Sequence, residues 1–163
     1  MSTAAKANDV QAEMAQLALQ AKSARDLMTR MVEVLHQRML KYNWVGFYML
    51  EAGQPPMLVL GSFQGAMTPH TRIPLHQGIC GAAASTGKTV VVDDVNLDPR
   101  YLACSLETKS EIVVPVFAHG KVVGELDIDS HFPAAFKDED RALVEFCASL
   151  VGESLEKSAK QKA

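Results

Sequence analysis

The sequence contains no uninterrupted apolar run that approaches the roughly 18 residues of a membrane span, so we expect no membrane partner. Its first ten residues lack the apolar segment that a secretory signal requires, which favours a cytoplasmic location. Cysteine is also scarce, with three residues in the chain. Because the cytoplasm is reducing, we expect these cysteines to be thiols and any disulfide between them to be transient and catalytic.

An excess of basic residues is missing as well. The formal net charge is −3, which argues against a nucleic-acid partner, because such a partner needs a clustered positive surface. Hydrophobic residues make up 48% of the chain, an ordinary share for a globular protein and too large for a disordered one. A chain of 163 residues fits one domain. We divide it into an N-terminal helical segment (1–41), a sheet and pocket region (42–136) and a C-terminal helix (137–163).

The N-terminal segment, residues 4–41, has the periodicity of a helix. Apolar or small residues recur in steps of three and four and form one stripe along it. Ser23 followed by Asp26 resembles a capping box, so we expect two helices with a joint near Ser23. A helix this long exceeds the width of a small sheet, so its stripe has room to face both the body of the domain and a partner subunit. A homodimer through the terminal helices is therefore one expectation.

Short extended runs dominate the rest of the chain. The predicted strands are 45–50, 57–60, 71–74, 90–92, 111–117 and 122–130, with a short helix at 78–85 and a last helix from 137. His119-Gly120 marks a tight turn between the last two strands. Strands joined by tight turns predict an antiparallel sheet, and helices at the two ends of the chain can both pack on one face of it. The fold class is therefore α+β.

An acidic stripe lies on the last predicted strand. Glu125, Asp127 and Asp129 alternate with apolar residues, and side chains two apart on a strand share a face. One interpretation is a solvated face of the sheet, polar outside and apolar inside. The other is the floor of a pocket, where buried acids with a raised pKa exchange protons. The sequence pattern alone leaves both open, but a nearby cysteine, Cys104, makes the second worth pursuing.

Six segments together resemble a known family. They read NWVGFYML, GSFQG, RIP-x3-GICG, YLACS, SEIVVPV and GELDIDS, and they cover about residues 42–141. In this order they are similar to the free methionine-(R)-sulfoxide reductases, which are stand-alone GAF-type domains. The resemblance implies a GAF-like sheet with a pocket of short helices and loops on the face opposite the terminal helices. It also implies reduction of free L-methionine (R)-sulfoxide by cysteine chemistry, with thioredoxin regenerating the thiols. We expect no metal and no cofactor.

The resemblance also assigns roles to individual residues. It makes Cys104, in the aperiodic loop 93–110, the nucleophile. The carboxylates that shape the substrate pocket would be Glu111, Asp127 and Asp129, and the aromatic residues that house the methyl end of the substrate would be Trp44 and Tyr48.

One position departs from the family pattern. A further cysteine is expected shortly before RIP, and here that residue is His70. Cys80 remains as a partner for Cys104 within the domain, and its place at the start of a helix favours the thiolate. Direct reduction of Cys104 by an external thiol is the alternative. Cys147 lies on the apolar side of the last helix, where we expect an inert core residue.

The chemistry also follows from the residue types. A sulfoxide sulfur becomes electrophilic when its oxygen is protonated, so a thiolate can attack it while a neutral carboxylic acid supplies the proton. Asp127 beside Asp129 offers such an acid, because two close carboxyls titrate as a pair. The same carboxyl groups suit an ammonium group on the substrate, but their negative charge would raise the pKa of the Cys104 thiol. Lys109 or backbone amides of the loop are candidates to counteract this increase in pKa.

The sequence also allows functions other than catalysis. A non-catalytic GAF-like sensor would bind a small, amino-acid-type molecule in the same pocket, and a scaffold would rely on the terminal helices alone. His70, His76, Cys80 and Cys104 form a nominal zinc set, but their spacing fits no ordinary zinc pattern.

Overall fold

The computed structural model describes residues 3–102 and 106–162. Three long helices and one short helix accompany a six-stranded sheet. The helices are α1 (Thr3–Gln20), α2 (Ala24–Arg38), α3 (Gly78–Thr86) and α4 (Asp138–Lys162), with a 3-10 turn η1 at Val95–Leu97. The strands are β1 (Trp44–Glu51), β2 (Met57–Gln64), β3 (Arg72–Pro74), β4 (Val90–Val92), β5 (Ser110–Ala118) and β6 (Lys121–Ser130). No helix among these residues has both the length and the apolar character needed to cross a membrane.

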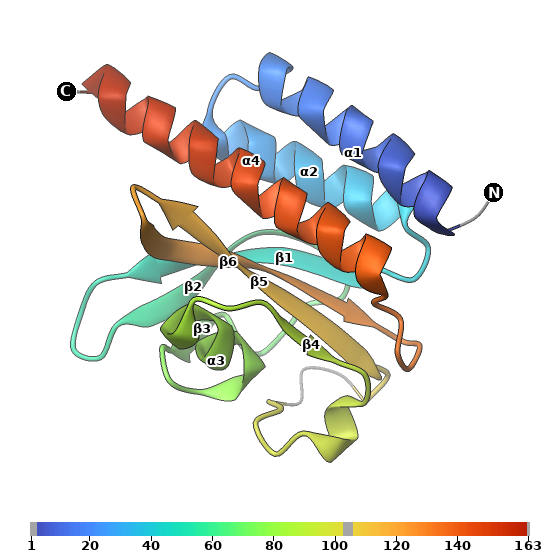
Figure 1. Cartoon of the computed structure of the whole chain (residues 1–163). Coiled ribbons are helices and arrows are strands. Elements are labelled where there is room, and N and C mark those ends of the chain that lie inside the picture. Colours follow the sequence, from blue (N-terminus) through green and yellow to red (C-terminus); the bar gives the residue numbers. More distant parts are fainter. Residues whose placement is uncertain (1–2, 103–105, 163) are drawn as a thin grey trace.

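The sheet is antiparallel and its order is β3-β2-β1-β6-β5-β4. Figure 1 shows α1, α2 and α4 together on one face of the sheet, and α3 with its neighbouring loops on the other. The predicted α+β architecture, with both terminal helices on one face, is confirmed. The central strands β1, β6 and β5 therefore have both faces covered, so their side chains on the α3 side are shielded from water.

Local sequence signals account for several element boundaries. Ser23 accepts a hydrogen bond from the Asp26 N–H at 3.0 Å, and the Asp26 carboxylate accepts one from the Lys22 N–H at 3.0 Å. This reciprocal pair starts α2 and confirms the predicted joint. His119 and Gly120 both have positive φ, 52° and 74°, as a two-residue hairpin turn between β5 and β6 requires.

The two faces of the sheet hold two different cores. Toward the three long helices, Val45 and Phe47 of β1 and Leu126 and Ile128 of β6 pack in a hydrophobic cluster. Toward α3, the second cluster contains Trp44, Tyr48, Cys80 and Val113 among others. The alternation along each strand decides which residues belong to which cluster. The acidic residues of β6 therefore lie on the α3 side of the sheet.

Two predicted segments differ from the structure in detail. Strand β2 continues through GSFQ to Gln64, and the pairing of β1 with β2 shifts register between Gly46 and Tyr48. The long loop 93–110 contains the turn η1, which begins where the Asp94 carboxylate accepts the Asn96 N–H at 3.0 Å.

The stripe of α1, including Val10 and Met14, is buried against this chain's own helices. A second subunit on the terminal helices stays a prediction.

Candidate active site

Four carboxyl groups are buried side by side beneath α3. Glu125, Asp127 and Asp129 of β6 are 0%, 4% and 5% exposed, and Glu111 of β5 is 5% exposed. Glu111 pairs in register with Asp129 across the two strands. The solvated-face interpretation of the acidic stripe is therefore wrong, because α3 and the adjoining loops cover this side of the sheet (Figure 1). The stripe is the floor of an enclosed site.

Burial makes these groups weak acids. It raises the pKa of all four, and the neighbouring Asp127 carboxyl raises those of Glu111, Glu125 and Asp129 further. The increase is smaller for Asp127, because hydrogen bonds from Glu111 and Cys80 favour its charged form. Among the described residues, no basic side chain contributes to any of these shifts. The cluster therefore holds its protons more tightly than ordinary carboxyl groups do, and its members share them.

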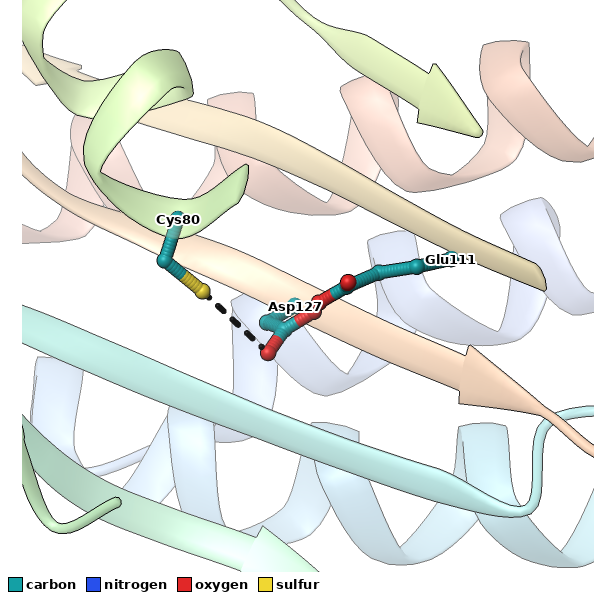
Figure 2. A group of neighbouring side chains, drawn as sticks. All are labelled: Cys80, Glu111 and Asp127. Carbon is teal, nitrogen blue, oxygen red and sulfur yellow. Dashed lines mark hydrogen bonds between the residues drawn. The ribbon is translucent and has the colours of Figure 1, made fainter. Parts of the chain in front are cut away.

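A cysteine thiol from α3 contacts the acid cluster. Cys80 is the third residue of α3, and its Sγ donates a hydrogen bond to Oδ2 of Asp127 at 3.4 Å. Figure 2 shows the thiol pointing down from α3 toward Asp127, with the Glu111 side chain reaching the same carboxyl from β5. Burial, and then the nearby acids Asp127, Glu125 and Glu111, raise the pKa of Cys80 well above its ordinary value.

The expectation that the helix start favours a Cys80 thiolate is therefore wrong for the resting site. A helix end stabilises a negative charge by roughly 0.3–1 kcal/mol, which is too little to offset complete burial beside several acids. Cys80 is held as a neutral thiol, and a base must take its proton before it can attack another sulfur.

A cavity of about 90 Å³ adjoins Asp127 and Asp129. It is lined by Trp44, Tyr48, Thr68, Asp127, Asp129 and His131, among others. Each water needs about 10–15 Å³ by this measure, so the cavity has room for roughly six to nine water-sized groups, the scale of a small molecule. Trp44 and Tyr48 line this cavity together with Asp127 and Asp129; that they house the methyl end of a substrate stays a prediction.

The two aromatic residues are held in place by their own contacts. The Trp44 indole stacks on Phe63 with ring centroids 5.8 Å apart, and its N–H donates to the Ala66 carbonyl at 3.0 Å. The Tyr48 hydroxyl donates to the His70 carbonyl at 2.7 Å. The polar ends of both side chains therefore have hydrogen-bond partners within the protein, which leaves their apolar faces to meet a ligand.

A second, smaller cavity of about 20 Å³ lies next to the first. Tyr48 and Asp127 line both cavities, and Cys80, Glu111 and His70 line the smaller one. The residue that replaces the expected family cysteine therefore borders the same space as Cys80. An imidazole cannot form a disulfide, so position 70 contributes shape and polarity to this space rather than a thiol.

The donor atoms could in principle hold a cation. The Cys80 thiol and carboxyl oxygens of Glu111 and Asp127 lie within 4.8 Å of one another. Neither His70 nor His76 joins this group among the described residues, so the nominal zinc set is not assembled. The raised pKa values mean that these donors hold their protons more tightly than usual, and a cation would have to displace those protons.

Comparisons with known proteins show the family of this chain. A family model for the GAF domain matches residues 23–155. The free methionine-R-sulfoxide reductase of Saccharomyces cerevisiae is 43% identical over 113 residues, which cover 69% of this chain and 62% of that protein. The structure of free methionine-R-sulfoxide reductase from Neisseria meningitidis, in complex with its substrate, matches with a TM-score of 0.90 and 33% identity, covering 100% of this chain and 95% of that one. The chain belongs to the free methionine-R-sulfoxide reductase family of GAF domains.

A further member of this family comes from Thermoplasma acidophilum. Its type II free methionine-R-sulfoxide reductase matches with a TM-score of 0.77 and 42% identity, over 82% of this chain and 93% of that one. The match to the yeast reductase spans only about three fifths of that protein's length. Family membership and the GAF fold are thus confirmed.

Three residues singled out from the sequence have different outcomes. Cys104, the expected nucleophile of the reductase family, lies outside the described residues. Lys109 is exposed. Cys147 is fully buried among the apolar residues of the helix-side core, and burial raises its pKa to about 12. The prediction of an inert core position for Cys147 is confirmed.

Glu125 belongs to the acidic stripe that is visible in the sequence, but it was not among the predicted pocket residues. It is the most deeply buried of the four acids. The signal that could have found it is its spacing, because Glu125, Asp127 and Asp129 must share one face of β6. An element that packs over Asp127, at the centre of the stripe, also buries Glu125 and Asp129 on either side of it.

Proposed function

We propose that this chain reduces free L-methionine (R)-sulfoxide to L-methionine with Cys104 as the nucleophile. The observation that carries the proposal is one cavity lined both by two buried acids, Asp127 and Asp129, and by two aromatic residues, Trp44 and Tyr48. Both features suit the substrate: the acids suit the sulfoxide oxygen and the aromatic residues suit the methyl end. The relatives that carry this activity in their names, one of them solved with its substrate, support the assignment.

In the proposed reaction the protons come from the cluster and the electrons from the thiol. A carboxylic acid group among Glu111, Asp127 and Asp129 protonates the sulfoxide oxygen, while the Cys104 thiolate attacks the sulfur. The oxygen passes to Cys104, leaving methionine and a cysteine sulfenic acid. A carboxyl group that holds its proton more tightly than usual is needed for the first half of this step, and the buried cluster supplies one.

Recycling completes the cycle. We propose that Cys80 resolves the sulfenic acid by forming a disulfide with Cys104, and that thioredoxin then reduces this disulfide. Cys80 suits the role because its thiol lies inside the site and borders the cavity that adjoins the substrate space. The alternative is direct attack of an external thiol on Cys104, with no internal disulfide.

A thiol-dependent assay on the two resolved epimers of free methionine sulfoxide tests the proposal. With dithiothreitol or thioredoxin as reductant, turnover should be found with the R epimer and be absent with the S epimer. Cys104→Ser should abolish turnover, and the matched control Cys147→Ser should retain it, because Cys147 lies on the opposite face of the sheet.

The non-catalytic sensor predicts a different result. Binding of methionine or its sulfoxide, seen as a rise in melting temperature, would then occur without turnover of either epimer. A protein that neither turns over nor binds these ligands would agree with the scaffold interpretation and contradict both others.

A further inference from the structure

The smaller cavity beneath α3 brings three metal-binding side chains together. Cys80 of α3, Glu111 of β5 and Asp127 of β6 all line this space of about 20 Å³. One ligand atom from each, the thiol sulfur and two carboxyl oxygens, lies within 4.8 Å of the other two. All three residues are buried. Buried acids beside a cysteine can have a purely structural role, so a ligand needs separate evidence.

The Asp127 carboxyl group supplies that evidence. This residue is 4% exposed, and its Oδ1 has no hydrogen-bond partner of ordinary geometry among the described residues. An unpartnered buried oxygen costs roughly 1–3 kcal/mol, and more when the group is charged. Because Asp127 lines both cavities, its carboxyl group borders open space that a ligand can fill.

The surrounding charges indicate that this ligand is a cation. Glu125 and Asp129 lie on the same face of β6 as Asp127, are buried, and also have carboxyl oxygens without partners. Within 3–102 and 106–162, no lysine, arginine or histidine forms an ion pair with any of the four acids of the cluster. Buried carboxylates are normally paired with a cation or bound to a metal ion. A positive ligand would therefore stabilise this part of the site.

The sulfur donor and the size of the cavity select the ion. A cavity of about 20 Å³ has room for roughly one water-sized group, which is too little for an organic cation. Magnesium and calcium ions prefer oxygen ligands, whereas a thiolate together with carboxylates suits Zn²⁺. Zinc binds sulfur at about 2.3 Å and carboxylate oxygen at about 2.0–2.2 Å, so these two atoms lie about 3.5 Å apart in a tetrahedral site. Cys80 Sγ and Asp127 Oδ2 already lie 3.4 Å apart.

We propose that Cys80, Glu111 and Asp127 bind one Zn²⁺ ion in the reduced protein. The three side chains supply one sulfur and two oxygen ligands and leave the fourth position of the tetrahedron for water. The S–H bond of Cys80 breaks, a Zn–S bond forms, and the proton passes to the solvent. The donor pairs lie within 4.8 Å, so the longest must shorten by roughly 1 Å to close around the ion.

This site differs from the nominal zinc set of the sequence. The two share Cys80, but here the other ligands come from β5 and β6, and the packing of α3 on these strands brings them together (Figure 2). The proposal departs from the expectation of no metal. Spacing patterns describe ligands that lie close together in the chain, so they do not detect a site that only packing assembles.

Zinc at this site should inhibit the enzyme, a consequence that rests on the proposed function. The ion would hold Glu111 and Asp127, which that function uses as proton donors, and Cys80, which it uses for recycling. Removal of the metal by a chelator leaves all three side chains intact, so the inhibition should be reversible.

Equilibrium dialysis of the reduced protein against Zn²⁺ tests the site. The wild type should bind one equivalent. Cys80→Ser, Glu111→Gln and Asp127→Asn should each weaken binding by at least about 10-fold, because the loss of even an outer partner of a metal ligand costs about 10–100-fold. Two matched controls should bind as wild type: Cys147→Ser, a cysteine on the other face of the sheet, and Glu33→Gln, an exposed glutamate on α2.

Cobalt(II) in place of zinc reports which atoms bind. A sulfur ligand gives a thiolate-to-cobalt charge-transfer band in the near ultraviolet, and this band should be present in the wild type and absent in Cys80→Ser. Circular dichroism checks that each variant is folded. Should Cys80→Ser fold poorly, the zinc affinities of Glu111→Gln and Asp127→Asn decide the question.

The remaining outcomes overturn distinct statements. A wild type that binds no zinc, unchanged binding in Cys80→Ser, or a cobalt complex without the sulfur band each overturns the site. Inhibition is measured separately, as methionine formed from free methionine (R)-sulfoxide by reduced protein without added thiol, with zinc and after chelation. Zinc that binds at Cys80 and leaves product formation unchanged contradicts the inhibition. A protein that forms no methionine without zinc contradicts the proposed function, while the binding measurement still decides the site.

Discussion

Replacing Asp129 by asparagine should increase the stability of the protein while it lowers its activity. Asp129 is 5% exposed and one of its carboxyl oxygens has no partner among the described residues. Burial, followed by repulsion from Asp127, raises its pKa well above the ordinary value. The folded state therefore prefers the protonated acid, and the stability associated with this group is fully present below the unfolded pKa of about 3.9. It is lost as the pH rises toward the raised folded value.

The magnitude follows from proton linkage. A single group that binds one more proton in the folded than in the unfolded state changes the free energy of unfolding by about 1.4 kcal/mol per pH unit. Asparagine has nearly the same shape and cannot titrate. Between pH 5 and pH 7 the variant should thus gain up to about 2.7 kcal/mol relative to wild type. This is an upper limit, because Glu111, Asp127 and Asp129 share their protons.

Urea unfolding at pH 5, 6 and 7 measures the effect. The difference in free energy of unfolding between Asp129→Asn and wild type should grow in favour of the variant with each step in pH. Asp93→Asn, at an exposed position after β4, is the control for the loss of a carboxylate outside the site. A constant difference for Asp129→Asn across this range would refute the reasoning, because it would mean that Asp129 titrates alike in the folded and unfolded chain.

Three further changes test the site and its support. Asp127→Asn should lower kcat/KM for free methionine (R)-sulfoxide by at least about 10², the usual scale for a lost acid–base group, and a near-wild-type value would remove Asp127 from the chemistry. Gly152→Ala should destabilise the protein by about 1–3 kcal/mol in urea unfolding, although alanine normally favours a helix, because its Cβ would overlap the Phe117 carbonyl oxygen. Tyr42→Phe should cost about 1.5–3 kcal/mol of stability, because it removes a buried 2.6 Å hydrogen bond to the Asp140 carboxylate; an unchanged unfolding midpoint would contradict this.

Element boundaries could be predicted from the sequence where a local contact sets them. The start of α2 depends on Ser23 and Asp26, which lie three residues apart, and the hairpin turn depends on His119-Gly120. Gly87, in the left-handed region with φ 70°, ends α3 at Thr86, one residue beyond the predicted helix 78–85. Such signals involve neighbouring residues only, so they can be seen without knowledge of the rest of the chain.

The burial of the acidic stripe could not be predicted in this way. Alternation along β6 has the same appearance whether Asp127 faces water or the underside of a helix. Only the packing of α3 onto β5 and β6, between segments about 30–50 residues apart, decides the matter. The protonation state of Cys80 was missed for the same reason: the helix start is visible in the sequence, but Asp127 and Glu125 beneath it are not.

The two faces of β6 show how one strand can serve both stability and chemistry. Leu126 and Ile128 are fully buried toward the long helices, and each contributes about 1.5–3 kcal/mol of apolar burial. On the opposite face, the acids next to them would each be destabilising if ionised. Because successive side chains alternate between faces, the helix side holds the strand in place whatever protonation the site adopts. A substitution that neutralises an acid should therefore stabilise the fold and weaken the reaction together, whereas truncation of Leu126 should lower stability without any change in the pH dependence.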